Sequence, residues 1–311
     1  MKKTFQLFKH RGFSEVFNDT FNFIKQYGKN FFSIFIKIFA FPMLFLLLCM
    51  YLMYDNLMIL SGMTSSPDVF FENNVFSFLG SLGIFMFVFG LLYLFLFAYP
   101  QIYFEEYAKL DHLSQKEVSF QAVVNGFKKH WKRIVLFGIF SLFVFGIILS
   151  IASVIAAFLV FIIIGIPLLF LLIPTALLWM YLSFSEYVIR RRDYFESISF
   201  AFQYLTNRFW HYVGSLLVIM ILIYIVNSIF TMVPYMIYFF QLFSSTSVEQ
   251  NLEMNSFTIF LTIIYIISIF VGIFTSNIIY ISSSLIYYSE REQLENRNSQ
   301  YDLQEIGQHH E

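Results

Sequence analysis

Residues 134–187 form a nearly unbroken run of apolar side chains that contains a single charged residue, Glu186. A helix that crosses a membrane needs about 20 mostly apolar residues, so this run is long enough for two. Inside a bilayer only helices and closed barrels satisfy all backbone hydrogen bonds. Barrel strands would alternate apolar and polar residues, and this run does not. It therefore predicts two membrane-spanning helices, with "GIP" at 165–167 as the turn between them.

Four further apolar runs raise the prediction to six membrane-spanning helices. These runs cover residues 31–54, 76–99, 212–236 and 257–287. Only 13% of the 311 residues are charged, against about a quarter in a typical soluble domain, so little polar surface is available to face water. We expect an all-α membrane protein, with a membrane domain over residues 1–289 and a polar, disordered cytoplasmic tail over residues 290–311.

The basic residues predict the orientation of these helices. The connections after the first, third and fifth predicted helices contain no Lys or Arg, and every basic residue except Lys37 lies at the opposite ends of the helices. Cytoplasmic loops carry an excess of Lys and Arg. We therefore expect a multi-pass protein with both termini in the cytoplasm.

Three cytoplasmic segments have the residue spacing of amphipathic helices. They are residues 13–31, 119–131 and 193–210. In the third, Ile198, Ala201, Phe202 and Leu205 share one helical face, opposite polar residues. Such helices lie in the headgroup plane of a membrane. Since each precedes a pair of spans, the pattern predicts three cytoplasmic-face amphipathic helices and a pseudo-threefold repeat of helix plus hairpin.

Basic and aromatic residues in these segments are predicted to bind the membrane surface. Each basic residue near anionic lipid contributes about 1 kcal/mol, and Trp prefers the interface. The predicted surface residues are Arg190, Arg191, Arg192, Arg208, Trp210, Lys128, Lys129 and Trp131. The expected partners are the bilayer, including anionic headgroups, and other membrane proteins, but no nucleic acid. The alternative for residues 193–210 is that the arginines only set orientation and the helix packs on neighbouring spans.

The polar groups within the spans are few. Glu186 lies near the inner end of the fourth predicted helix, and Asn227 and Asn277 lie deeper in the fifth and sixth. An ionisable group at such a position indicates function, but Glu186 also has the spacing for an ion pair with Arg190. For the asparagines, hydrogen bonds between helices compete with a polar path for a small solute. Small residues at 146, 150, 153 and 157 predict close helix contact.

Two motifs resemble catalytic sequences but lack the residues that would complete a site. "HRG" at 10–12 resembles the start of a phosphodiesterase barrel, yet no barrel follows. Glu105 and Glu106 resemble the paired glutamates of intramembrane CAAX-type proteases, which also need His residues on later spans. None of the six histidines lies within a predicted span. We therefore expect no enzyme, no metal site and no cofactor.

The stretch from Pro174 to Trp210 resembles a bacterial family. Its pattern is a Pro-containing span, Glu186 near the inner end, "ESISFAFQYL" at 196–205 and "NRFW" at 207–210. This is similar to the six-span membrane domain of membrane-anchored glycerophosphoryl diester phosphodiesterases, which also occurs alone in inner-membrane proteins. The resemblance implies an integral membrane module without a catalytic role. We therefore expect a scaffold or assembly factor of a membrane complex; the alternative is a transporter or lipid-handling protein with a path between the spans.

Overall fold

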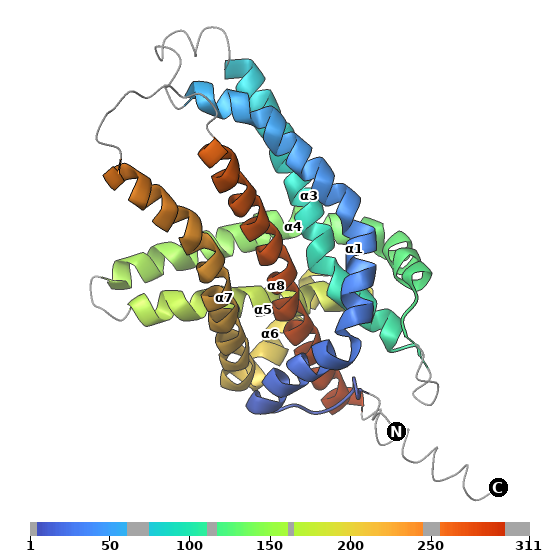
Figure 1. Ribbon diagram of the computed structural model, residues 1–311. Helices are drawn as coiled ribbons and strands as arrows, with labels where there is room; N and C mark the ends of the chain where they lie inside the picture. The colour runs from blue at the N-terminus through green and yellow to red at the C-terminus, as the bar shows by residue number, and fades with distance from the viewer. Residues whose placement is uncertain (1–4, 61–74, 111–116, 161–164, 245–255, 296–311) are drawn as a thin grey trace, which may run out of the picture. The chain divides into compact units, whose positions relative to one another are not determined.

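The chain folds into helices throughout the part that the structure describes. The computed structural model describes residues 5–60, 75–110, 117–160, 165–244 and 256–295 (Figure 1). The helices in these ranges are α1 (Phe13–Leu60), α3 (Val75–Tyr107), α4 (Phe120–Val160), α5 (Gly165–Val188), α6 (Tyr194–Asn207), α7 (Phe209–Ser244) and α8 (Ser256–Glu295). The prediction of an all-α chain is confirmed for these residues.

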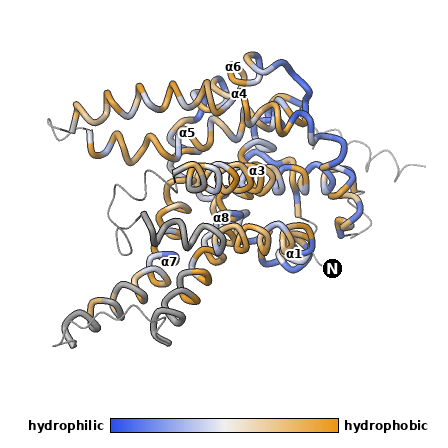
Figure 2. Tube along the Cα trace, turned by 90° about the horizontal axis from the view of Figure 1, so that it is seen from above, coloured by the Kyte–Doolittle hydropathy of each residue, from blue (hydrophilic) through white to orange (hydrophobic). Residues whose placement is uncertain are grey.

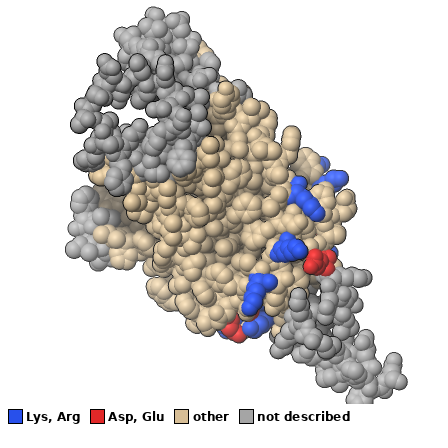
Figure 3. Space-filling model, in the orientation of Figure 1, with Lys and Arg blue, Asp and Glu red and all other residues tan. Residues whose placement is uncertain are grey.

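Six of these helices, all except α6, are long and apolar enough to cross a membrane. Hydrophobic residues cover most of their length (Figure 2). Charged side chains are sparse on the face drawn in Figure 3, where most of the described surface is uncharged. The prediction of a multi-pass membrane protein with six candidate spans is therefore confirmed.

Helices α1 and α4 are longer than a bilayer is thick. At 1.5 Å per residue, the 48 residues of α1 and the 41 residues of α4 extend about 72 Å and about 61 Å along their axes. A bilayer with its headgroup regions is about 45 Å thick. A helix of either length that crosses at an ordinary tilt extends beyond the membrane, and the polar residues of both are concentrated in their N-terminal halves.

Only one of the three predicted amphipathic segments is a separate helix in the described residues. Residues 13–31 are continuous with the rest of α1, and residues 119–131 continue into α4, whereas α6 stands alone between two spans. The pseudo-threefold repeat of helix plus hairpin is thus not visible in the described residues. The physical reason is that an amphipathic stripe and an apolar span share the same helical period, so nothing between them forces the helix to end.

Helix ends differ from the sequence prediction at two further places. Gly165, Ile166 and Pro167 form the first turn of α5 instead of a turn between helices, and a proline is well tolerated in a first turn. α8 continues to Glu295, past the expected domain boundary at residue 289, with Glu290 and Arg291 buried. The rest of the expected tail, 296–311, lies outside the described residues.

Local capping explains where two helices begin. The Glu15 carboxylate accepts a hydrogen bond from the Gly12 amide at 2.9 Å, which satisfies a backbone donor ahead of α1. Ser119 Oγ accepts from the Ala122 amide at 3.1 Å and caps α4. The sequence "SQKE" at 114–117, which has the residue pattern of a capping box, lies mostly outside the described residues.

The described chain divides into two compact units. Unit 1 comprises residues 1–5, 23–146 and 187–194, and unit 2 comprises the remaining residues. The core of unit 1 is a cluster of buried aromatic side chains between α1 and α3. It includes Phe23, Phe31, Phe35, Tyr99, Tyr103 and Phe104. Aromatic pairs of this kind add to the energy of area burial and fix the contact between the two helices.

In unit 2, α7 and α8 pack against each other. α5 joins them through Tyr181, which stacks on Tyr280 with ring centroids 5.8 Å apart and shares a 2.7 Å hydrogen bond with Ser284. Ser282, Ser283 and Ser284 are fully buried on α8. Small residues let helices approach closely in a membrane, so this serine run explains why the contact forms there.

Candidate functional site

The predicted surface residues are mostly exposed. Arg190, Arg191, Lys128, Lys129, Trp131 and Trp210 are exposed, and Arg192 and Arg208 are half-buried. Trp131 is 50% exposed and Trp210 66% exposed. Tryptophans this open to the surroundings are available to a membrane interface.

The three arginines form the turn between α5 and α6, and α4 holds that turn. Arg191 has a backbone φ of 58°, a left-handed conformation that is uncommon for residues other than glycine, within the turn that follows α5. The Arg133 guanidinium donates to the Arg192 carbonyl at 2.5 Å and lies 4.2 Å from the centre of the Tyr187 ring. The turn is thus fixed by a hydrogen bond and a cation–π contact.

Helix α6 buries part of the apolar face that the sequence predicted, together with residues beside it. Ala201 and Leu205 are buried as expected, but Phe202 is 50% exposed, while Ser197 and Tyr204 are buried. On α5, Trp179 Nε1 donates to the Ile198 carbonyl at 3.1 Å. These contacts match the alternative in which the helix packs on a neighbouring span.

Glu186 is completely buried in unit 2. The Tyr204 hydroxyl of α6 donates to its Oε1 at 3.3 Å. α5 ends at Val188, two residues before Arg190, and the ion pair of Glu186 with Arg190 stays a prediction. Glu186 thus links α5 to α6.

The two asparagines do not come together. Asn227 Oδ1 accepts from the Thr275 hydroxyl at 3.2 Å, which joins α7 to α8. Asn277 donates to the Ile273 carbonyl of its own helix at 2.9 Å. The contact of Asn227 is the interhelical hydrogen bond that the sequence analysis weighed against a polar path.

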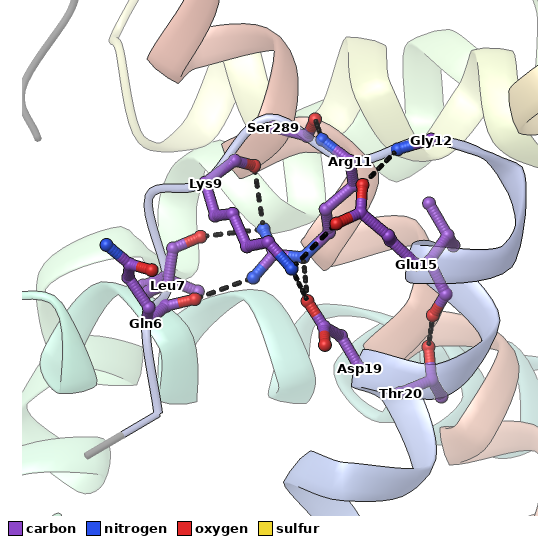
Figure 4. Close-up of polar contacts among 10 residues, drawn as sticks. Gln6, Leu7, Lys9, Arg11, Gly12, Glu15, Asp19, Thr20 and Ser289 are labelled. Atoms are coloured by element: carbon purple, nitrogen blue, oxygen red, sulfur yellow. Dashed lines mark hydrogen bonds and ion pairs between the residues drawn. The ribbon is translucent and has the colours of Figure 1, made fainter. Parts of the chain in front are cut away.

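The most extensive polar site is centred on Arg11, which is completely buried (Figure 4). Its guanidinium donates to Asp19 at 2.9 Å and to the carbonyls of Gln6, Leu7 and Lys9 at 2.6 to 3.1 Å. Its backbone amide donates to Ser289 Oγ at 2.8 Å. Burial lowers the pKa of Arg11, and the Asp19 carboxylate opposes that shift. Arginine nevertheless keeps its charge, so these acceptors are required for its burial.

Neighbouring contacts extend this site, which we call the N-terminal clasp: residues 6–20 together with Tyr212, Ser215 and residues 287–291. Ser215 of α7 donates to the Phe13 carbonyl at 3.0 Å. The Tyr212 hydroxyl donates to the Glu290 carboxylate. The Arg291 guanidinium lies 5.5 Å from the centre of the Phe8 ring. The clasp therefore fastens the N-terminal segment to the start of α7 and the end of α8.

The paired glutamates of α3 form an ion-pair cluster in unit 1. Glu105 lies 3.0 Å from both Lys129 and His130, and 3.3 Å from Lys109. Glu106 pairs with Lys109 as well. Burial lowers the pKa of Lys109, but its hydrogen bond to Glu106 and the charge of Glu105 outweigh burial and raise it. The cluster ties α3 to the start of α4.

The sequence analysis missed the roles of Arg11 and His130. The sequence analysis considered Arg11 only as part of the "HRG" motif and His130 only as one of six histidines outside the predicted spans, yet both are buried. The only local signal was the acidic pair Glu15 and Asp19, one turn apart on the helix that follows Arg11. Over the ranges that the structure describes, no three His, Cys, Asp or Glu residues are grouped so as to hold a metal ion.

Both polar sites can hold helices together. Their carboxylates face basic groups at ion-pair distance. Comparison with protein-family models, with characterised proteins and with solved structures finds no match to this chain.

Proposed function

We propose that the protein is a non-catalytic scaffold or assembly factor of a bacterial inner membrane that binds another membrane protein through α4. The observation that carries this proposal is the stripe of small residues on α4, Gly146, Ser150, Ser153 and Ala157. All four are exposed. A Cβ atom added to Gly146 would meet no heavy atom within 4 Å. Stripes of this kind let a second helix approach closely.

The buried ionisable groups support a structural role. Arg11 and Asp19 hold the N-terminal clasp, and Glu105 holds α4 against α3. An enzyme needs a reactive group that is left available to its substrate. The resemblance of residues 174–210 to a non-catalytic membrane domain points in the same direction.

The basic and aromatic surface residues support the inference that the ends of the helices which carry them lie at the cytoplasmic surface of the membrane. We infer that Arg190, Arg191 and Lys129 lie near anionic headgroups, with Trp131 and Trp210 at the interface. Both termini would then be cytoplasmic. A transporter or lipid carrier, the competing function, has less support because Asn227 and Thr275 bond to each other and need no solute.

The proposal is tested by in-membrane crosslinking from α4. A photoreactive amino acid at Ile147, which is 61% exposed, should form a crosslink to a second membrane protein. The same amino acid at Phe145, 3% exposed on the same helix, is the matched control and should crosslink only within the chain. Gly146→Leu should abolish the Ile147 adduct, because a large side chain blocks close helix approach.

The control for Gly146→Leu is normal abundance and an unchanged elution volume in detergent. Crosslinks from Ile147 to lipid alone, in cells that express the protein at its natural level, would contradict the scaffold function.

A further inference from the structure

A pocket of about 490 Å³ lies within unit 1 between α1, α3 and α4. Pro42 and Phe45 of α1, Leu91 and Phe95 of α3, and Phe127 of α4 are among its ten apolar lining residues. Such a volume is typical of small-molecule sites. On α1 the lining extends from residue 38 to residue 45, about 10 Å along the helix.

The pocket is closely packed around Phe39 and Phe127 and open beside Phe45. The Phe127 ring lies 6.3 Å from Phe39 and 5.8 Å from Phe95, measured between ring centroids, so it bridges α1 and α3. Phe39 is buried, whereas Phe45 is 45% exposed. An apolar pocket open at this level of a span is filled by hydrocarbon, because no water is available there.

A single charged residue, Lys128, completes the lining. It is exposed and forms no ion pair with any residue that the structure describes. Lys128 precedes the apolar run of α4 that begins after Arg133, so its ammonium reaches the headgroup level. The pocket therefore has hydrocarbon walls and one cation where a headgroup would lie.

We propose that this pocket binds one anionic phospholipid, with an acyl chain between Phe45 and Leu91 and the phosphate at Lys128. A neutral lipid would supply the chain but not the net negative charge. A polar, water-soluble molecule would make few favourable contacts with the apolar walls. The site does not depend on the scaffold function, since its lining residues on α4, at 124–128, are not part of the small-residue stripe that begins at Gly146.

The test uses the full chain in phosphatidylcholine vesicles that contain a small fraction of photoreactive lipid. The lipid carries a diazirine in its acyl chain and has either a phosphatidylglycerol or a phosphatidylcholine headgroup. Mass spectrometry of the digested protein should find adducts on residues 38–45, 88–95 and 124–128, at least several times more with phosphatidylglycerol. Lys128→Gln should lower the phosphatidylglycerol adducts about fivefold, the factor expected for one basic residue near an anionic lipid.

Two further variants separate the headgroup site from general surface charge. Lys132→Gln removes an exposed lysine one turn further along α4 that does not line the pocket, and should leave labelling unchanged. Val88→Trp should fill the pocket and remove the adducts of both lipids. Equal labelling by the two lipids, or an equal effect of the two lysine variants, would overturn the headgroup assignment. Undiminished labelling in Val88→Trp, with the protein still monodisperse, would overturn the pocket itself.

Discussion

At the scale of single residues, Arg11 shows how a charge becomes structural. Its guanidinium can lie in the protein interior because Asp19 and three main-chain carbonyls accept hydrogen bonds from it. Lysine is a poor replacement, since an ammonium lacks the planar fork that reaches several acceptors at once. Removal of the guanidinium would leave Asp19 with Lys9 as its remaining basic partner, at 3.4 Å.

We therefore predict that Arg11→Ala lowers the free energy of unfolding by about 3 kcal/mol or more, as breaking a buried pair does, and that Arg11→Lys recovers only part of this loss. Lys9→Gln is the matched control, because Lys9 is partly exposed and its pairs are weaker. Denaturant unfolding in mixed micelles measures all three. Equal stability of Arg11→Ala and Lys9→Gln would show that the clasp is unimportant.

The role of Arg11 could not be predicted from its neighbours in sequence. Most of its acceptors are backbone carbonyls, which every residue type carries, and Ser289 is 278 positions away. Asn227 was more predictable, since a polar side chain deep in a span must find a partner. The sequence placed Phe202 on one face with Ala201 and Leu205 but did not predict that Phe202 would stay 50% exposed, because tertiary packing selects which apolar residues of α6 are buried within the protein.

At the scale of helices, the contact of α3 with α4 depends on glycine. A Cβ atom at Gly126 would lie 2.7 Å from Cγ2 of Ile102, and Ile102 is completely buried. Because this methyl group branches directly from Cβ, it has little freedom to move away. The absence of a side chain at Gly126 is therefore what lets the two helices approach.

We predict that Gly126→Ala lowers the free energy of unfolding by about 1 to 3 kcal/mol, the usual cost of overpacking. Gly146→Ala on the same helix should cause no loss, because its Cβ would meet open space. Thermal unfolding of the two variants in the same detergent gives the comparison. A tolerated Gly126→Ala would mean that the α3–α4 contact is looser than these distances indicate.

The helices themselves were the most predictable level. The apolar runs exceed the length needed to span a bilayer, so six spans followed from hydropathy alone. Their ends were less predictable, because backbone hydrogen bonding continues through any segment that tolerates helix. This is why residues 13–31 and 119–131, which were expected to form separate helices, are continuous with α1 and α4.

At the scale of the whole molecule, the prediction concerns sidedness. The charge asymmetry predicts that alkaline phosphatase is active when fused after Asp68 or Glu253 and inactive when fused after Lys116 or Arg192. Of these positions only Arg192 lies within the described residues. Enzyme activity normalised to fusion abundance is the measurement. Activity after Lys116 would contradict the six-span topology with both termini in the cytoplasm.

The N-terminal clasp also imposes an order on biosynthesis. The Arg11 amide and its acceptor Ser289 are 278 residues apart, and at synthesis rates of about 5 to 20 residues per second the ribosome needs on the order of 14 to 56 seconds to bridge that distance. During this interval the first helix is already made while one of its fastenings does not yet exist. A nascent chain released before Ser289 therefore carries an N-terminal segment that lacks one of the hydrogen bonds that hold it in the finished protein.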